Sequence, residues 1–342
     1  KSSVPGFPGS CFVGARPAAT FAPMRAAFTL FRPLRPPRSA APPTSWWGAG
    51  AAAAAFAAGA GAASSCDIGG DRTQIYSGHV EMVRFRGTTL MKQLQDEGRG
   101  DREARALASL SASAAWSPFV PKYCGVDTDG EGRRWLCMDN LTAGMQRPVV
   151  MDLKVGTRHW SPGEKEKKRL KEIQKSATTT IGSLGLRVVG CKIPGADYSD
   201  DGVENWGYKP GRDPTAEELP TVIQRFLRTE SRIRQARVFT AGLLAHFRLQ
   251  GDYVFMGSSL LFAYDAALGD AAPLRVSMID FGHAHAMAEM RAEAAAEGRD
   301  EEFEARDVGY LCGLGSLMAM LGGEAAALYD AADDAAGVAV AR

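Results

Sequence analysis

An aspartate and a lysine stand two residues apart in an otherwise apolar run, Pro148-Val149-Val150-Met151-Asp152-Leu153-Lys154-Val155-Gly156. Side chains alternate between the faces of a β-strand, so Asp152 and Lys154 share one face. An exposed ion pair stabilises little, and this pair is better suited to contacting a hydroxyl, a metal ion or a phosphate. The alternative is an exposed edge strand that carries the two charges by chance. The opposite face carries the residues that we expect to be buried, Val149, Met151, Leu153 and Val155.

A second carboxylate, Asp280, lies in the apolar run Met278-Ile279-Asp280-Phe281. Burying a carboxylate without a partner is costly, so Asp280 is predicted to meet a cation or several hydrogen-bond donors, as the metal-binding aspartate of protein kinases does. The alternative is an aspartate that caps the next segment. His283 and His285 follow, but with Asp280 as the only ligand close by a zinc set is incomplete. We therefore expect the two histidines to pack in the core or the site.

Cations gather directly after the Asp152–Lys154 strand, between Arg158 and Lys175. This segment is predicted to be a helix, with Ser161 as its cap and Pro162 in its first turn. A polyphosphate ligand requires several cations around it, whereas the alternative is a solvated charged helix. The lysines that share one helix face, at i, i+3 and i+7, are Lys168, Lys171 and Lys175.

Length and composition limit the class of protein. A chain of 342 residues can form one large domain or two lobes. Its formal net charge of +1 gives no general attraction for nucleic acid, and no run of ~20 apolar residues indicates a membrane span. The six cysteines are scattered, without a C-x-x-C pair, which is typical of an intracellular protein with reduced thiols.

The chain changes character near residue 67. Residues 1–66 contain no acidic residue and are rich in Ala, Pro and Arg, so they cannot build a core of their own. This composition resembles an organelle transit peptide; the alternatives are a disordered extension, or sequence that is not translated, since the chain begins at Lys1. An Ala-rich tail is expected at 326–342.

The patterned part reads as two lobes. The small lobe, 67–141, is predicted to hold strands at 79–85, 88–92 and 135–138, a helix at 101–111 and an extended link at 119–123. For the larger lobe, 142–325, we expect a strand at 183–190, a loop at 197–214, one long helix at 219–250 with Val238 on its apolar face, and antiparallel strands at 255–265 and 276–281. Arg187 could reach the site or a structural carboxylate, while Lys209 and Arg212 are further candidates for phosphate contacts.

The nine-residue pattern resembles the signature of the inositol polyphosphate kinase family. The resemblance covers about residues 74–322, with departures at Asp139-Asn140, where the family more often has Glu-Asp, and at Gly282, where it has Ala. No phosphate-binding glycine motif of protein kinases or P-loop enzymes is present. The further blocks that resemble the family are Leu90-Met91-Lys92, Arg99-Gly100-x-x-Glu103, Phe119-Val120-Pro121, Ser183 to Gly190, Ser258-Ser259-Leu260-Leu261, Ile279 to His283 and Asp307 to Leu314.

The resemblance implies an α+β, two-lobed kinase-like fold, with antiparallel sheets in the larger lobe and a helical segment that binds inositol phosphate. It implies an ATP- and Mg²⁺-dependent kinase of inositol polyphosphates. For the nucleotide, the resemblance implies that Lys92 contacts the phosphates, that Glu103 orients Lys92, and that Asp139 and Leu141 form the adenine hinge. It implies that Asp280 and Ser259 bind the metal ion and that Asp152 contacts the nucleotide or a hydroxyl. It implies that Lys154 contacts the substrate and the transferred phosphate, and that the further substrate contacts come from Arg158, Lys168, Lys171 and Lys175. Whether Asp152 is a general base is left open.

Two branches of the family fit equally, the hexakisphosphate kinases and the multikinases; the trisphosphate 3-kinases fit less well, because no long insert is present. An alternative from another functional class is a silent binding protein, which binds inositol phosphates without catalysis. Such a protein would be expected to have lost at least one of four key residues, but all four are present: Lys92, Asp152, Lys154 and Asp280. A third hypothesis is a nucleic-acid or membrane-surface protein that uses the basic N-terminus. We expect a monomer in the cytoplasm or nucleus, with organelle targeting as the alternative.

Overall fold

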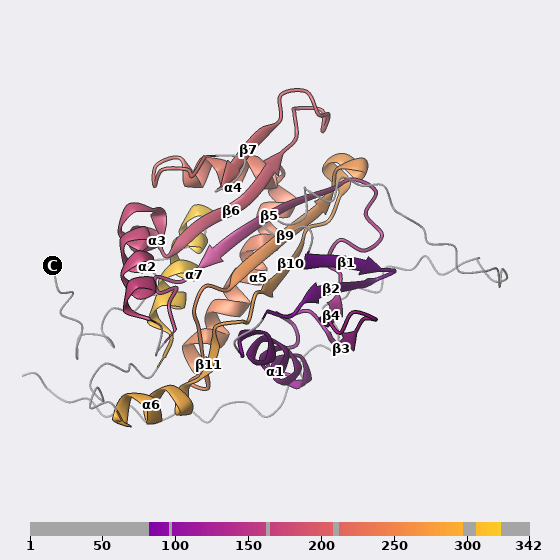
Figure 1. The fold of residues 1–342 in the computed structure, drawn as a ribbon. Helices are drawn as coiled ribbons and strands as arrows, with labels where there is room; N and C mark the ends of the chain where they lie inside the picture. The colour runs from indigo at the N-terminus through magenta and orange to yellow at the C-terminus, as the bar shows by residue number, and fades with distance from the viewer. Residues whose placement is uncertain (1–81, 96–97, 162–164, 208–211, 297–305, 323–342) are drawn as a thin grey trace, which may run out of the picture. The chain divides into compact units, whose positions relative to one another are not determined.

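The computed structural model describes residues 82–95, 98–161, 165–207, 212–296 and 306–322 (Figure 1). They all belong to one compact unit. The extension predicted at 1–66 and the tail predicted at 326–342 lie outside the described residues. Within the described ranges, no helix is both long and apolar enough to cross a membrane.

A four-stranded antiparallel sheet forms the first part of this unit, in the order β1-β2-β4-β3. Helix α1 (Arg99–Ala112) packs on the sheet through buried Leu107 and Leu110. The predicted link at 119–123 is followed by a strand that the sequence analysis missed, because β3 alternates only between half-buried and exposed side chains. The strands are β1 (Val83–Arg86), β2 (Thr89–Gln93), β3 (Tyr123–Thr128) and β4 (Arg134–Asp139).

A five-stranded sheet forms the second part, in the order β10-β9-β5-β6-β7, with every pair of neighbours antiparallel. Strand β5 lies at its centre, and the first sheet lies beside its β10 edge (Figure 1). The loop predicted at 197–214 is wrong in part, because it contains β7 as an edge strand. The strands are β5 (Pro148–Val155), β6 (Leu186–Ile193), β7 (Glu204–Gly207), β9 (Ser259–Asp265) and β10 (Arg275–Ile279).

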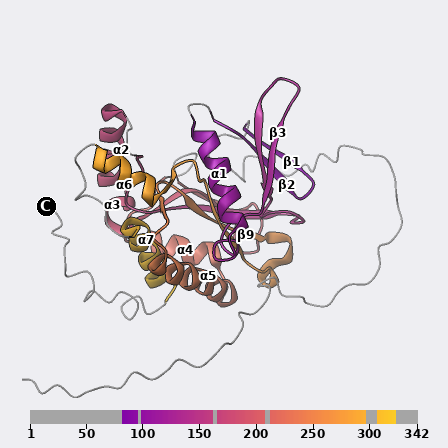
Figure 2. The ribbon, with the colours of Figure 1, turned by 90° about the horizontal axis from the view of Figure 1, so that it is seen from below.

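Helices α4 (Leu219–Leu227), α5 (Glu230–Leu249) and α7 (Val308–Met320) gather on one side of the second sheet, and α1 lies on the other (Figure 2). The short elements are α3 (Thr180–Leu184), β8 (Tyr253–Phe255), the 3₁₀-helix η3 (Ala266–Ala271), β11 (Ala284–Ala286) and α6 (Met287–Ala296). Strand β11 pairs with β8. The strand predicted from residue 183 begins three residues later, because Ser183 and Leu184 end α3 and Gly185 turns the chain at φ +61°.

The single helix predicted at 219–250 is wrong. The chain breaks at Arg228, which has φ 62°, and Thr229 caps the second helix by accepting a hydrogen bond from the Arg232 backbone N–H. The Arg228 guanidinium donates to three consecutive carbonyls, of Pro194, Gly195 and Ala196, and so fixes the corner against the loop after β6. Val238, predicted on the apolar face, is exposed.

Candidate active site

Strand β5 separates the core from the candidate site. Val149, Met151, Leu153 and Val155 are buried in the main core, which confirms the predicted burial of that face. Asp152 and Lys154 lie on the other face, where Lys154 pairs with Ser259 of β9 in the sheet register. The two charges therefore lie on the inner strand of a sheet and not on its edge, so the edge-strand alternative is wrong.

The same face becomes apolar toward the start of β5. Val150, Leu261, Ala263 and Ile279 form a small buried cluster, apart from the main core, and Leu141 and Met145 pack against it. Arg275 fixes the loop above this cluster by donating to the carbonyls of Leu141 and Ala143. This face of the second sheet is thus apolar beneath the loop after β4 and charged at the end of β5. Such an arrangement suits a ligand with a flat aromatic ring at one end and phosphate groups at the other.

Lys92 of β2 bridges the two sheets. Its Nζ lies 2.7 Å from Oε1 of Glu103 on α1 and 2.6 Å from Oδ1 of Asp280 after β10. Burial would lower the pKa of Lys92, but the two carboxylates hold it above its ordinary value. Burial would likewise raise the pKa of Asp280, but the charge of Lys92 and its hydrogen bond lower this pKa by more. The Asp280 carboxyl therefore stays ionised. Lys92 is therefore a positioned cation between two carboxylates.

Arg99, at the start of α1, is a site residue that the sequence analysis missed. Its charge acts on Lys154, Asp280 and His283 together, which places it at the charged end of the face. A Cβ on Gly282 would lie 2.7 Å from Arg99 Nε, so the arginine packs closely on the turn after Asp280. The block Arg99-Gly100-x-x-Glu103 contained the signal, but only Glu103 was assigned a role there.

Asp152 Oδ1 and Ser259 Oγ are buried oxygens that make no hydrogen bond of normal geometry to the described residues, although the Ser259 hydroxyl lies close enough to lower the pKa of Asp152. Burial, and then the charge of Asp280, raise the pKa of Asp152 to about 6. Orphaned buried oxygens beside a half-exposed carboxylate, that of Asp280, fit a hydroxyl or a hard cation, since Mg²⁺ takes one or two carboxylates and completes its shell with water and substrate phosphates. Across the described ranges, no group of three His, Cys, Asp or Glu side chains forms a closed metal site.

Lys154 has no ion-pair partner within hydrogen-bonding reach in the described part of the chain. Burial lowers its pKa, although Asp280 and Asp152 act against this, and Lys175 adds to the lowering. A half-buried ammonium group without a direct partner is costly. It points past Gly257, whose added Cβ would lie 3.7 Å from Lys154 Nζ. An anionic ligand would satisfy it.

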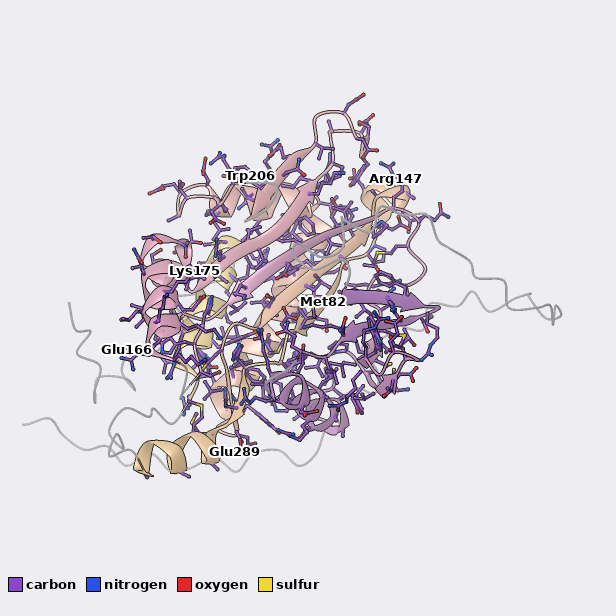
Figure 3. All side chains as sticks on the ribbon, in the orientation of Figure 1. Met82, Arg147, Glu166, Lys175, Trp206 and Glu289 are labelled. Atoms are coloured by element: carbon purple, nitrogen blue, oxygen red, sulfur yellow. The ribbon has the colours of Figure 1, made fainter. Side chains whose placement is uncertain are left out.

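The predicted basic helix is α2 (Glu166–Thr178), which starts later than expected. Ser161 does not cap it, because Ser161 Oγ binds His283 and His285 instead; Pro162 lies outside the described residues. Lys175 is half-buried and lies beside the end of β5 (Figure 3), and it also pairs with Glu172 at 3.4 Å. Lys168 and Lys171 are exposed on the same helix.

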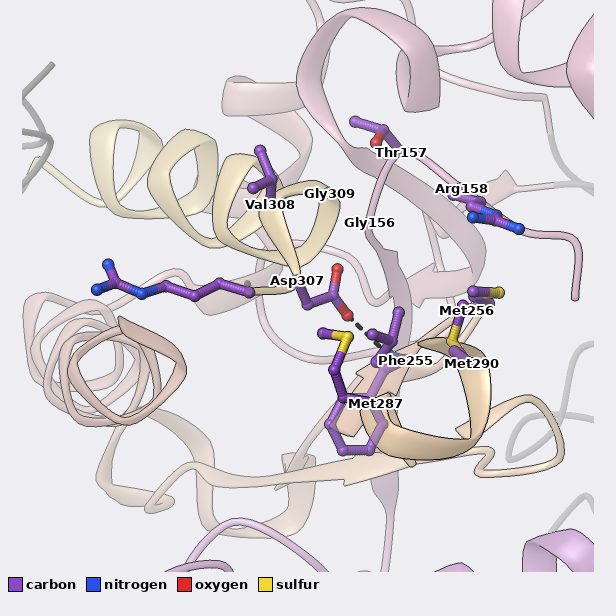
Figure 4. Close-up of a pocket in the computed structure, with 12 residues that line it drawn as sticks. Gly156, Thr157, Arg158, Phe255, Met256, Met287, Met290, Asp307, Val308 and Gly309 are labelled. Atoms are coloured by element: carbon purple, nitrogen blue, oxygen red, sulfur yellow. Dashed lines mark hydrogen bonds between the residues drawn. The ribbon is translucent and has the colours of Figure 1, made fainter. Parts of the chain in front are cut away.

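Three other cations have partners of their own. Arg187 lies opposite Lys154 in the sheet register, and so on the same face of the sheet, and it pairs with Asp213 at 2.7 Å, so the structural carboxylate predicted for it is found. Arg212 pairs with Glu218 and lies over the Trp206 ring, and Lys209 is outside the described residues. Arg158 donates to the Trp160 carbonyl and lines a separate cavity of about 230 Å³ together with Met256 and the start of α7 (Figure 4).

Comparisons with known proteins point to one family. A family model described as inositol polyphosphate kinase matches residues 135–322. The chain is 26% identical over 221 residues to inositol hexakisphosphate kinase 3 of Mus musculus, a match that covers 59% of this chain and 54% of that protein. It is 28% identical over 227 residues to inositol polyphosphate multikinase beta of Arabidopsis thaliana, covering 56% of this chain and 75% of that one.

A likeness of fold accompanies these matches. The crystal structure of inositol phosphate multikinase Ipk2 of S. cerevisiae, in complex with ADP and Mn²⁺, superposes with a TM-score of 0.52 at 20% identity, covering 69% of this chain and 98% of that chain. The α+β kinase-like fold expected from the sequence is confirmed. The chain spans about half the length of the mouse and human hexakisphosphate kinases that it matches.

Proposed function

Because the chain belongs to the inositol polyphosphate kinase family, we propose that it transfers the γ-phosphoryl group of ATP to an inositol phosphate. One observation carries this proposal. A single face of the second sheet holds the small apolar cluster and, further along, Asp152 and Lys154, and the ion pair of Lys92 with Asp280 lies next to these charges. Phosphoryl transfer depends on positioning and on neutralising charge. This face offers both.

The nucleotide would lie with its base on the cluster of Val150, Leu261, Ala263 and Ile279, beneath the loop that carries Leu141. Asp139 ends β4 at the same place, as the hinge role requires. Lys92 then reaches the phosphates, held in position by Glu103. The base and the phosphates thus find apolar and cationic surroundings in the order in which ATP presents them.

Asp280 and Ser259 would hold the divalent cation, and Asp152 adds a buried carboxylate to the same place. A bound cation supplies neutralisation of the phosphate charge. The raised pKa of Asp152, about 6, keeps this residue close to the range in which it can exchange a proton with a substrate hydroxyl. That position supports the proposed role of Asp152 as a nucleotide or hydroxyl contact.

Lys154 would contact the phosphoryl group in transit and a substrate phosphate. It lies between Asp280 and Lys175, and so between the nucleotide side and α2. Arg99 adds a second cation at this point, and Lys168, Lys171 and Lys175 of α2 form the outer side of the substrate site. The substrate class is an inositol polyphosphate, and the hexakisphosphate kinase and multikinase branches remain the two candidates, each represented among the relatives.

The test uses the purified full chain with ATP and Mg²⁺, and separately inositol trisphosphate, pentakisphosphate and hexakisphosphate, with products separated by anion exchange. A pyrophosphate product from the hexakisphosphate identifies the first branch, and sequential products from the trisphosphate identify the second. A folded chain that binds these ligands and forms no product contradicts the kinase proposal and favours the silent binding protein. Mn²⁺ in place of Mg²⁺ tests the choice of metal.

A further inference from the structure

Helix α1 contacts the two-stranded sheet of β8 and β11 near both ends of that sheet. Arg102 Nη1 donates a hydrogen bond to the carbonyl of Gly282, 3.3 Å away, in the turn that precedes β11. Two turns further along α1, Ser109 Oγ lies 2.9 Å from the hydroxyl of Tyr253, which pairs with the last residue of β11. Residues seven positions apart lie on the same side of a helix, about 10 Å from each other. One side of α1 therefore lies along this small sheet.

The turn that Arg102 contacts carries the carboxylate that we propose for the metal ion. Gly282 follows Asp280 by two residues, and Asp280 has a left-handed backbone with φ 64°. A side chain of α1 holds the middle one of the next three carbonyls, and backbone N–H groups hold the other two. The three hydrogen bonds run from Ala284 N–H to the Phe281 carbonyl, from Arg102 to the Gly282 carbonyl, and from Met256 N–H to the His283 carbonyl.

Two neighbouring residues of α1 act on Asp280 by different routes. Glu103 Oε1 lies 2.7 Å from Lys92 Nζ, which lies 2.6 Å from Asp280 Oδ1, so Glu103 acts on the carboxylate through Lys92. Arg102 acts on the backbone behind that carboxylate, through Gly282. Under the proposed function, the nucleotide phosphates draw Lys92 away from Asp280. The route through Arg102 does not depend on Lys92 and therefore persists when the nucleotide is bound.

We propose that Arg102 is a positioning residue of the metal site, which keeps the Asp280 carboxylate in place for a divalent cation once Lys92 contacts the nucleotide phosphates. The inference rests on the proposed function, because it takes Asp280 as the metal-binding carboxylate. Groups behind a metal ligand fix its orientation and so strengthen metal binding. The hydrogen bond between Ser109 and Tyr253 assists, because it holds α1 at the other end of the same contact.

Metal binding without turnover gives the first test. The full chain is titrated with Mn²⁺ at a constant concentration of ADP, and bound Mn²⁺ is measured by electron paramagnetic resonance. Arg102→Met removes the guanidinium and should raise Kd for Mn²⁺ about tenfold. Arg102→Lys keeps the charge and a donor and should recover most of that loss. An unchanged Kd in a folded Arg102→Met protein would overturn the proposal.

The matched control lies on the same helix. Arg105 is exposed, one turn further along α1, and makes no hydrogen bond or ion pair within the described ranges. Arg105→Met removes the same charge as Arg102→Met and should leave Kd for Mn²⁺ unchanged. An equal rise in both variants would show that Arg102 acts through its charge alone, against the positioning role.

Hydrogen exchange of the ligand-free chain reports on the turn itself. The N–H of Ala284 closes the turn by donating to the Phe281 carbonyl. In Arg102→Met this N–H should exchange about tenfold faster, because the carbonyl between the two residues loses its partner on α1. In Arg105→Met it should exchange as in the wild type. Equal rates in the wild type and in Arg102→Met would contradict the role of this contact in fixing the turn.

Steady-state kinetics separate positioning from contact with the substrate. In Arg102→Met, the Mg²⁺ concentration that gives half the maximal rate should rise about tenfold. KM for the inositol phosphate should stay within about twofold of the wild-type value. A large rise in that KM with an unchanged dependence on Mg²⁺ would show that Arg102 contacts the substrate, and would overturn the positioning role.

The failure of the function and the failure of the positioning role are distinguishable. If the wild-type chain forms no product, the kinase proposal fails, and Kd for Mn²⁺ still tests Arg102. If product forms with the same Mg²⁺ dependence in both proteins, the function stands and the positioning role fails.

Tyr253→Phe replaces Arg102→Met if the latter does not fold. It removes the hydroxyl that contacts Ser109 and keeps the ring edge-on to Trp116, with centroids 6.2 Å apart. This variant should raise Kd for Mn²⁺ about threefold, and an unchanged Kd would then count against the proposal.

Discussion

Lys92 and Asp280 are 188 positions apart in the chain, yet Lys92 Nζ lies 2.6 Å from Oδ1 of Asp280. This ion pair joins the edge of the second sheet to the first sheet, and the bond from Lys92 to Glu103 extends the link to α1. The lysine that we propose for the nucleotide phosphates and the aspartate that we propose for the metal ion are therefore in contact before either meets a ligand. Under the proposed function, ligand binding exchanges this contact for contacts with phosphate and metal.

Replacing Lys92 by Met should remove activity and weaken the fold. We expect kcat/KM for ATP to fall at least about 100-fold, since a cation on the phosphates is lost. Glu103, only 4% exposed, would lose its partner, so the free energy of unfolding should fall by about 1–3 kcal/mol. Steady-state kinetics and urea unfolding measure the two effects. Arg134→Gln, which breaks the exposed pair of Arg134 with Asp101, is the control and should change neither.

Replacing Lys154 by Met should separate activity from stability. Turnover should fall by about two orders of magnitude or more. The melting temperature should stay constant or rise, because the substitution removes a half-buried cation that has no direct partner among the described residues. Product analysis and differential scanning calorimetry on the same preparation check both parts. Substantial turnover in the folded variant would contradict the role assigned to Lys154.

Asp152 should make both activity and stability depend on pH. Burial, followed by the charge of Asp280, raises its pKa from 3.8 to about 6. Between these values the folded protein keeps a proton that the unfolded chain has released, so stability falls as pH rises through this window and the penalty is complete above about pH 6. If the ionised carboxylate is required, kcat/KM should decline on the acid side with an apparent pKa near 6.

Asp152→Asn tests the same residue through stability alone. The amide stays neutral, so the variant should be more stable than the wild type at pH 8 by ~2–3 kcal/mol, while the two should be similar near pH 4. Urea unfolding of the ligand-free proteins at both pH values measures the difference. A constant difference across this range would show that Asp152 does not carry the shifted pKa.

The cations of α2 should act on the substrate and not on the nucleotide. Lys175→Gln should raise KM for the inositol phosphate roughly tenfold, and Lys168→Gln and Lys171→Gln should raise it less, because those side chains are exposed. KM for ATP should stay constant in all three. Arg169→Gln is the matched control on the same helix, about 120° around the axis from Lys175. An equal effect of Arg169→Gln would indicate general electrostatic attraction only.

Local patterns predicted the part of the site that one strand carries. The alternation of β5 placed Asp152 and Lys154 on one face and four apolar residues on the other, as found. Strands with weak apolar alternation, β3 and β7, escaped the pattern, because both lie at the edge of a sheet and their side chains are only half-buried or exposed. The break at Arg228 escaped it too, since contacts from a distant loop hold that backbone angle.

Contacts between distant segments explain what else was missed. Ser161 precedes a helix and has the side chain of a cap, so its local sequence indicated one. Two histidines more than 120 positions away compete for the same hydroxyl and bind it. Arg99 likewise reads as the first residue of a helix, and only its packing on Gly282 reveals that it belongs to the site.

Asp280 adopts φ 64°, a left-handed backbone angle that few side chains tolerate and that Asn, Asp and Gly accept most readily. The identity of this residue is thus constrained twice, by the chemistry of its carboxylate and by the shape of the chain. Among the acceptable replacements, asparagine preserves the turn and removes the charge. An Asp280→Asn substitution would therefore remove the carboxylate at little structural cost. We expect a relative that carries asparagine at this position to bind the ligands without catalysing phosphoryl transfer.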